Sequence, residues 1–175
     1  MRSTSFFKFC PVCGGRTQLA GVRHPHPTCI VCGFVFYQNA KPTASAIPIN
    51  SRGEILLVRR AINPQKGCWD APGGFLEEWE TPEAGVRREL REELGVRLKR
   101  LRLLGVYMDS YRQRYTAATL NVIYLAEIAG GRLAPADDVA GYRWFALNRV
   151  PASRLAFPWI RRAIEDIWKI KNRSS

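Results

Sequence analysis

Three glutamates stand close together in a segment that the sequence predicts to be helical. Glu89 precedes Glu92 by three residues and Glu93 by four, and side chains at these spacings are neighbours on one face of a helix. Like charges placed in this way repel each other, by about 0.2–0.5 kcal/mol per exposed pair and by more beside an apolar surface. Any fold that this chain adopts must therefore offset the repulsion.

The helix that carries the glutamates is predicted to run from about residue 82 to residue 94. Thr81 is a suitable N-cap, Pro82 suits the first helical position, and Gly95 can supply the C-terminal stop. The apolar residues of the helix share one side of a helical wheel, and they are Val86, Leu90 and Leu94. Gly85 lies within the acidic sector, where the lack of a side chain would let a bulky ligand approach.

A divalent cation bound by the carboxylates would turn their repulsion into attraction. Hard oxygen ligands with open water positions favour Mg²⁺ or Mn²⁺ over zinc, and a substrate phosphate usually completes the coordination shell. The alternative is a solvated charged face in which Glu83 pairs with Arg87 and Arg88 pairs with Glu92. For an isolated helix the second explanation is the commoner one, so the residues ahead of the helix decide between them.

The spacing of residues before and within the helix resembles the complete Nudix box. From Gly74 five residues lead to Glu80, seven more lead to Arg88-Glu89-Leu90, and Glu92-Glu93, Gly95 and Val96 follow. Seven specified positions at an average residue frequency of about 6%, tried in every register of this chain, would coincide by chance with a probability on the order of 10⁻⁶. The similarity extends from about Thr43 to Trp168, and it includes residues 69–74 before the box and residues 143–145 after it.

This resemblance implies a hydrolase that cleaves a nucleoside diphosphate linked to another moiety and uses Mg²⁺ or Mn²⁺. In the Nudix family the residues matching Glu89 and Glu93 are the principal metal ligands. The residue matching Glu92 is a further ligand or the base that takes a proton from water, and the carbonyl of Gly73 would add a ligand. The implied fold is α+β, a Nudix α/β/α sandwich with a mixed sheet.

Two further residues of the box have an orienting role by the same resemblance. Arg88 would pair with Glu80 and so hold the preceding loop on the helix. Apolar patterns elsewhere predict strands and a second, core-facing helix, at residues 43–49, 54–60, 103–109, 119–128 and 142–147 for the strands and 159–171 for the helix. Gly53 marks a hairpin turn between the first two strands.

Four cysteines near the N-terminus form two Cys-x-x-Cys pairs, and they are Cys10, Cys13, Cys29 and Cys32. Fifteen residues separate the pairs, a spacing at which four thiolates close a tetrahedral zinc site. The alternatives are two redox disulfides or four unrelated thiols. We predict a zinc ribbon at residues 1–40 and a Nudix domain at residues 41–175. The zinc would be structural, because four protein ligands leave no position for water.

A four-cysteine ribbon before a Nudix domain resembles the NADH pyrophosphatase branch, also called the NAD-capped RNA hydrolases. That branch has a proline-rich and aromatic signature after its box, whereas this chain has no proline between Pro82 and Pro135. The departure counts against NADH specificity and leaves ADP-ribose, other nucleotide sugars, dinucleotides and nucleoside triphosphates as candidate substrates.

Residues outside the box are expected to select the substrate. Tyr111, Arg112 and Arg114 offer an aromatic face and two guanidinium groups, although a basic hairpin turn would explain them equally well. Asp137 and Asp138 would either add a carboxylate to the site or form a polar turn before a strand.

The charge of the chain points to anionic partners. Lys and Arg number 27 against 15 acids, and residues 1–50 contain no Asp or Glu. A second hypothesis follows, a zinc-ribbon protein that binds nucleic acid or senses nucleotides through a Nudix fold. The complete set of box glutamates favours the hydrolase. Capped RNA, bound through the basic surface, and a second copy in a homodimer are further candidate partners.

A cytoplasmic protein without membrane contact is expected. The longest apolar runs, such as residues 55–58, are far too short to cross a bilayer, and no basic-then-apolar leader precedes the first cysteine.

The cysteine spacing predicts one tightly held zinc ion per chain. Four thiolates bind zinc strongly enough for the ion to survive dialysis against metal-free buffer. Elemental analysis of the dialysed protein checks this, and a zinc content far below one equivalent would contradict the prediction.

Overall fold

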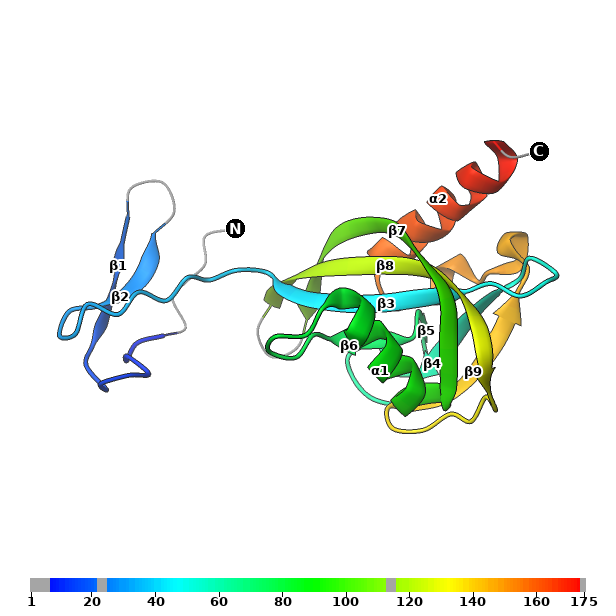
Figure 1. The fold of residues 1–175 in the computed structure, drawn as a ribbon. Coiled ribbons are helices and arrows are strands. Elements are labelled where there is room, and N and C mark those ends of the chain that lie inside the picture. Colours follow the sequence, from blue (N-terminus) through cyan, green and yellow to red (C-terminus); the bar gives the residue numbers. More distant parts are fainter. Residues whose placement is uncertain (1–6, 22–24, 113–115, 174–175) are drawn as a thin grey trace. The chain divides into compact units, whose positions relative to one another are not determined.

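The computed structural model describes residues 7–21, 25–112 and 116–173, without the side chains of residues 111–117. The chain forms two compact units, Met1–Asn39 and Ala40–Ser175 (Figure 1). In the first unit, strands β1 (Thr17–Ala20) and β2 (His26–Cys29) form an antiparallel pair.

The second unit contains two sheets. Their strands are β3 (Lys41–Pro48), β4 (Ile55–Arg60), β5 (Trp69–Asp70), β6 (Gly73–Phe75), β7 (Val96–Arg112), β8 (Thr116–Gly131) and β9 (Val139–Phe145). One sheet has the order β6-β3-β8-β7 and the other has the order β5-β4-β9. Strand β3 runs parallel to β8, whereas its pairing with β6 is antiparallel, so the larger sheet is mixed.

Helix α1 (Pro82–Leu94) begins and ends where its capping signals predict. The Thr81 hydroxyl accepts a hydrogen bond from the N–H of Ala84, and Gly95 adopts the left-handed conformation that ends the helix, with φ 68°. The apolar stripe of the helix packs on the small side chains of Ala44 and Ala46 in β3, which allow close approach.

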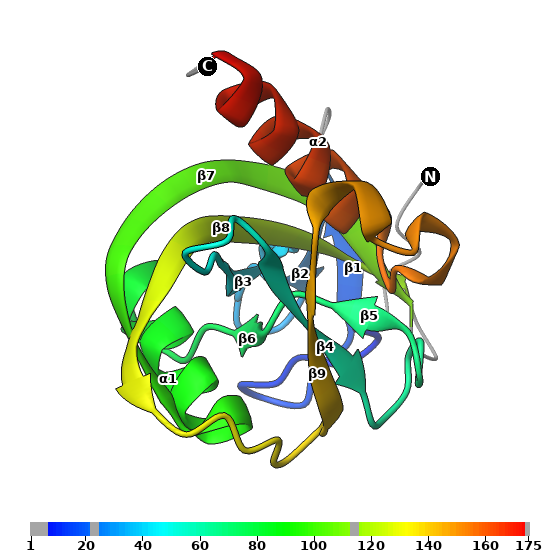
Figure 2. The same ribbon diagram turned by 90° about the vertical axis from the view of Figure 1, so that its right-hand side faces the viewer.

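Two hydrophobic cores lie on opposite faces of the sheets. Along β4, Ile55 and Leu57 face one core, while Leu56 and Val58 face the other. Helix α1 belongs to the second core and helix α2 (Pro158–Arg173) to the first, and the two helices lie on different sides of the strands (Figure 2). The predicted α+β sandwich with a mixed sheet is confirmed. No described helix has the length and apolar character needed to span a membrane.

The predicted hairpin around Gly53 is wrong. Gly53 does lie in a turn, with φ 75°, but β3 and β4 belong to different sheets and share only one isolated bridge, between Ile49 and Ile55. Strand β3 pairs instead with β6 through residues 43–45 and with β8 along its other edge.

Strands β7 and β8 are much longer than the predicted segments 103–109 and 119–128. Their pairing contains register shifts at three places, between residues 97 and 98, 99 and 102, and 103 and 105. Each irregularity changes which side chains of the strand face inward, so the alternation of apolar and polar residues is interrupted. The sequence pattern therefore predicts only a part of each strand.

Helix α2 is fixed to the second half of β7 by side-chain hydrogen bonds. The Tyr107 hydroxyl donates to Asp166 at 2.9 Å, and the backbone N–H of Trp159 donates to Asp109 at 2.9 Å. These contacts hold the start of α2, and the buried Trp159 ring with it, close to the end of β7.

Leu90→Ala should lower the free energy of unfolding by ~2–5 kcal/mol, because the Leu90 side chain of α1 is fully buried against β3 and its truncation leaves a cavity. Leu103→Ala, at a position that is 56% exposed on β7, is the matched control and should change stability by less than ~1 kcal/mol. Urea unfolding measures both variants, and equal losses would contradict the packing described.

Candidate active site

Helix α1 brings the three glutamates to one end of the second unit, in environments that differ sharply. Glu93 is 6% exposed, whereas the side chain of Glu89 is 16% exposed and that of Glu92 is 50% exposed. A solvated charged face therefore describes Glu92 but not Glu93.

The buried carboxyl group of Glu93 is held by one backbone donor. The N–H of Gly73 donates to Glu93 Oε2 at 2.9 Å, which links α1 to β6. Burial raises the pKa of Glu93 to about 9, and the nearby Asp138 carboxylate contributes to the rise. Burial also raises the pKa of Glu89, against the lowering effect of Arg88. A buried carboxylate pair of this kind is stabilised by a bound cation.

The glycines of this segment are required by close contacts. At Gly73, where φ is 141°, an added Cβ would lie 2.3 Å from the carbonyl oxygen of Ala44, and at Gly74 it would lie 2.4 Å from Glu89 Oε1. The Gly73 and Gly74 backbone therefore approaches β3 and the carboxylates more closely than any side chain would allow.

The expectation that Gly85 leaves room for a ligand is wrong. A Cβ at Gly85 would lie 2.5 Å from Leu76 Cδ2 and 2.9 Å from Glu80 Oε2. The space beside this glycine is filled by the preceding loop, which packs directly on α1.

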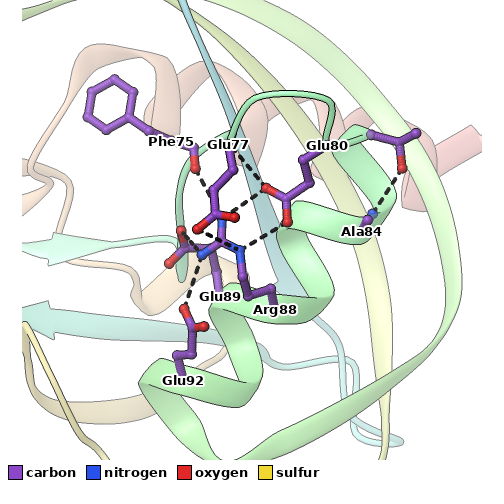
Figure 3. A network of polar contacts seen from close by, with 8 residues as sticks. Phe75, Glu77, Glu80, Ala84, Arg88, Glu89 and Glu92 are labelled. Carbon is purple, nitrogen blue, oxygen red and sulfur yellow. Dashed lines mark hydrogen bonds and ion pairs between the residues drawn. The ribbon is translucent and has the colours of Figure 1, made fainter.

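Arg88 is the centre of the polar network on the exposed side of the site (Figure 3). It forms a bidentate pair with Glu80, with both N···O distances at 2.9 Å, the arrangement that the resemblance implies. Its Nη1 also donates to Glu89 at 2.8 Å and to Glu92 at 3.0 Å. Hydrogen bonds to Glu80 are the main cause that raises the pKa of Arg88. Arg88 thus offsets the repulsion between Glu89 and Glu92.

The alternative helix pairing of Glu83 with Arg87 is absent from the ion pairs of the described residues. Glu83 accepts a hydrogen bond from the Tyr124 hydroxyl at 2.8 Å, and Arg87 donates to the carbonyl of Leu98 at 2.5 Å. Both side chains fasten α1 to the strands beside it.

Further charged groups reach the site from outside the helix. Asp138, just before β9, lies close enough to raise the pKa values of Glu93, Glu89 and Asp70. Asp137 adopts a left-handed conformation, with φ 54°, in the turn before β9. Asp70 pairs with Arg60 at 2.8 Å, and burial raises the pKa of Asp70 to about 6 although Arg60 lowers it.

The donor chemistry of the site suits a hard divalent cation. Glu89, Glu93 and Asp138 supply oxygen atoms only, and burial makes the charged forms of Glu89 and Glu93 unfavourable without a cation beside them. Among the described residues, the group whose ligand atoms lie close enough together to hold a metal ion is that of the four cysteines, all within 4.8 Å of one another.

The four cysteines of the first unit converge as the spacing predicts. Cys10 Sγ lies 3.7 Å from Cys32 Sγ, and Cys13 Sγ lies 3.5 Å from Cys29 Sγ. A tetrahedral zinc ion with Zn–S bonds of ~2.3 Å separates its sulfurs by about 3.8 Å. None of the cysteines forms a disulfide. The sulfur positions therefore fit one tetrahedral zinc ion.

Backbone donors support this cysteine cluster. The N–H of Val12 points to Cys10 Sγ at 3.4 Å, and the N–H groups of Val31 and Cys32 point to Cys29 Sγ at 3.4 and 3.5 Å. The Cys32 N–H is the main cause that lowers the pKa of Cys29, which favours the thiolate form that zinc binds.

Three residues predicted to select the substrate fall at the edge of the described structure. Tyr111 and Arg112 lie at the end of β7, but their side chains, and the whole of Arg114, lie outside the described residues. These three assignments stay predictions.

Comparison with known proteins identifies the family. The family model described as the NUDIX domain matches residues 39–167. The chain belongs to the Nudix family. It is 38% identical over 124 residues to an ADP-ribose pyrophosphatase of Methanocaldococcus jannaschii. The aligned residues cover 71% of this chain and 71% of that protein. It is 28% identical over 171 residues to the NAD-capped RNA hydrolase NudC of Vibrio atlanticus, covering 95% of this chain but 61% of that protein.

Among solved structures, a Nudix hydrolase from Nitrosomonas europaea superposes with a TM-score of 0.73 at 29% identity, covering 91% of this chain and 92% of that one. The predicted Nudix membership, with relatives in the NADH pyrophosphatase branch, is confirmed, and so is the predicted class of enzyme, a Nudix pyrophosphohydrolase.

The buried state of Glu93 predicts an unusual pH dependence of stability without added divalent cations. A carboxyl group whose pKa rises from 4.5 to about 9 on folding loses stability as pH increases across that window, because the folded state must hold its proton. Glu93→Gln should therefore reduce the dependence of the melting temperature on pH. At pH 8 this variant should be more stable than wild type. The exposed Glu92→Gln variant is the control, and calorimetric profiles of Glu93→Gln and wild type that run parallel would contradict the prediction.

Proposed function

We propose that this Nudix enzyme is a Mg²⁺- or Mn²⁺-dependent hydrolase that cleaves the pyrophosphate bond of a nucleoside diphosphate linked to a sugar, with ADP-ribose as the first candidate. NAD(H) and other nucleotide sugars belong to the same class. The observation that carries the proposal is the buried Glu93 carboxyl group, which the Gly73 N–H holds beside Glu89 and Asp138. Similarity to an ADP-ribose pyrophosphatase over 71% of the chain supports the choice of substrate.

In this proposal Glu93 and Glu89 are the main ligands of the cation. A bound cation would neutralise the diphosphate and lower the pKa of a coordinated water. The Gly73 N–H fixes the orientation of Glu93, and the side-chain-free Gly74 leaves room for Glu89. The carbonyl of Gly73 is proposed as a further ligand.

Glu92 has the most exposed carboxylate of the three, and we assign it the removal of a proton from the attacking water or a further metal contact. Its hydrogen bond to Arg88 keeps its side chain over the exposed end of the site. Arg88 is a positioning residue, because it contacts Glu80, Glu89 and Glu92 and so aligns the loop with the helix.

Capped RNA is a second candidate substrate. The similarity to NudC covers 95% of this chain and so extends over the cysteine unit. The absence of acids from residues 1–50 also favours a polyanionic partner. A purely nucleotide-sensing role has less support, since the box glutamates are complete. Cytoplasmic localisation and a homodimer stay predictions.

Glu92→Gln and Glu93→Gln should each reduce turnover of ADP-ribose by at least ~10²-fold, because each removes a metal contact or the base from phosphoryl chemistry. Glu165→Gln, at an exposed position on α2, is the matched control and should keep wild-type turnover. Steady-state kinetics with Mg²⁺ and with Mn²⁺ measure the effect. Activity within a few-fold of wild type in both site variants would refute these roles.

The same assay with a substrate panel distinguishes the candidates. It compares ADP-ribose, NADH, a nucleotide sugar, a dinucleoside polyphosphate, a nucleoside triphosphate and NAD-capped RNA. The highest kcat/KM for a sugar-linked diphosphate supports the proposal, and no hydrolysis of any member refutes it.

A further inference from the structure

One face of the larger sheet changes from apolar to polar along its strands. In β3 and β8 the side chains of Ile47 and Ile123 face the core beneath α2. Toward the other end of the same face polar residues replace them, with Thr43 directly opposite Asn121, and they are Thr43, Ser45, Thr119 and Asn121. All four are at most 8% exposed. Apolar side chains would be the stable choice for such a buried face, so this polar floor calls for a functional explanation.

Asn121 holds the floor in one arrangement. Its Oδ1 accepts a hydrogen bond from the Thr43 hydroxyl at 2.8 Å, and its Nδ2 donates to the carbonyl of Tyr107 at 2.9 Å and to Thr119 Oγ1 at 3.1 Å. Both amide hydrogens are therefore used within the protein, and the carboxamide orients the two threonines.

Two hydroxyl groups keep unused capacity. The Thr119 hydroxyl accepts from Asn121 but donates to none of the described residues, and the Ser45 hydroxyl, in a residue 5% exposed, forms no hydrogen bond with them. No buried side-chain nitrogen or oxygen in the described part of the chain lacks a partner. The Ser45 oxygen must therefore reach open space, which is the pocket that both residues line.

This pocket begins at the catalytic end of the sheet. Gly73 and Gly74 line it, next to the carboxyl groups of Glu93 and Glu89. Its volume is about 120 Å³, well below the roughly 300–1,000 Å³ of pockets that enclose a drug-sized ligand. Space of this size takes a single ring beside the diphosphate and excludes a whole nucleoside.

Two aromatic side chains also line the pocket, and contacts with neighbouring residues hold both in place. Phe157 and the buried Trp159 line the pocket from the start of α2. The Arg60 guanidinium lies 5.4 Å from the centre of the Phe157 ring and pairs with Asp70 at 2.8 Å. The lining thus combines aromatic rings with hydroxyl groups, which suits carbohydrate rings because they have apolar faces and polar edges.

We propose that this pocket binds the sugar ring attached to the diphosphate, and that the hydroxyl groups of Ser45 and Thr119 select it by hydrogen bonding to sugar hydroxyls. The inference rests on the proposed function and narrows its substrate to diphosphates that carry a pentose-sized ring with hydroxyl groups. An apolar group of the same size would leave the Ser45 hydroxyl without a partner, and the site would therefore disfavour it.

Equilibrium binding of three monophosphates to the full chain with Mg²⁺ tests this. They are ribose 5-phosphate, cyclopentylmethyl phosphate, which has a ring of the same size without hydroxyls, and methyl phosphate, which has no ring. Wild type should bind ribose 5-phosphate at least ~5-fold more tightly than either of the others. Ser45→Ala should reduce this preference to within about twofold, with the affinity for methyl phosphate unchanged.

Matched variants separate hydroxyl recognition from a general packing effect. Thr119→Ser keeps the hydroxyl and should keep the preference, whereas Thr119→Val removes it and should lose most of the preference. Ser51→Ala, at an exposed position in the turn before β4, is the distant control. Circular dichroism melting confirms that each variant is folded.

Equal affinities of wild type for ribose 5-phosphate and cyclopentylmethyl phosphate would overturn the inference. An equal loss for all three ligands in Ser45→Ala would do the same, because it would indicate a structural role. Since the measurement requires no turnover, it can fail while ADP-ribose is hydrolysed, and it can succeed if the substrate panel fails.

Discussion

The hydrogen bond from the Gly73 N–H to the buried Glu93 carboxyl group connects every part of the site. It joins α1 to β6, and β6 is an edge strand of the sheet that also supplies the polar floor. Burial makes the charged form of Glu93 unfavourable, with a pKa near 9. The protein therefore holds a carboxyl group whose charged form a divalent cation would stabilise, and this is the physical basis of the proposed chemistry.

The residues around this bond keep the loop and the helix together. Gly74 and Gly85 lack side chains because Glu89 and the loop residue Leu76 occupy the adjoining space. Arg88 grips Glu80 on the loop while it neutralises Glu89 and Glu92 on the helix. One arginine thus offsets the repulsion between the acids on the exposed side, and on the buried side the proposed cation would do so.

In the proposed function, the polar floor would extend the site away from the diphosphate. The start of α2 adds aromatic side chains to the same pocket, and the hydrogen bond from the Trp159 N–H to Asp109 holds it in place. The proposal therefore assigns chemistry and recognition to different elements, with the carboxylates on α1 and the ring contacts on β3, β8 and the start of α2.

The sequence by itself determined α1, its caps and the cysteine cluster, because these depend on residues three or four apart or on paired ligands with a fixed spacing. Only the tertiary structure decided that β3 and β4 part into different sheets and that Gly85 packs against the loop. It also decided that Asp138 and Ser45 face the site. Such contacts join distant segments through strand register and helix packing, and these follow from the competition among all strands for partners, which no local pattern records.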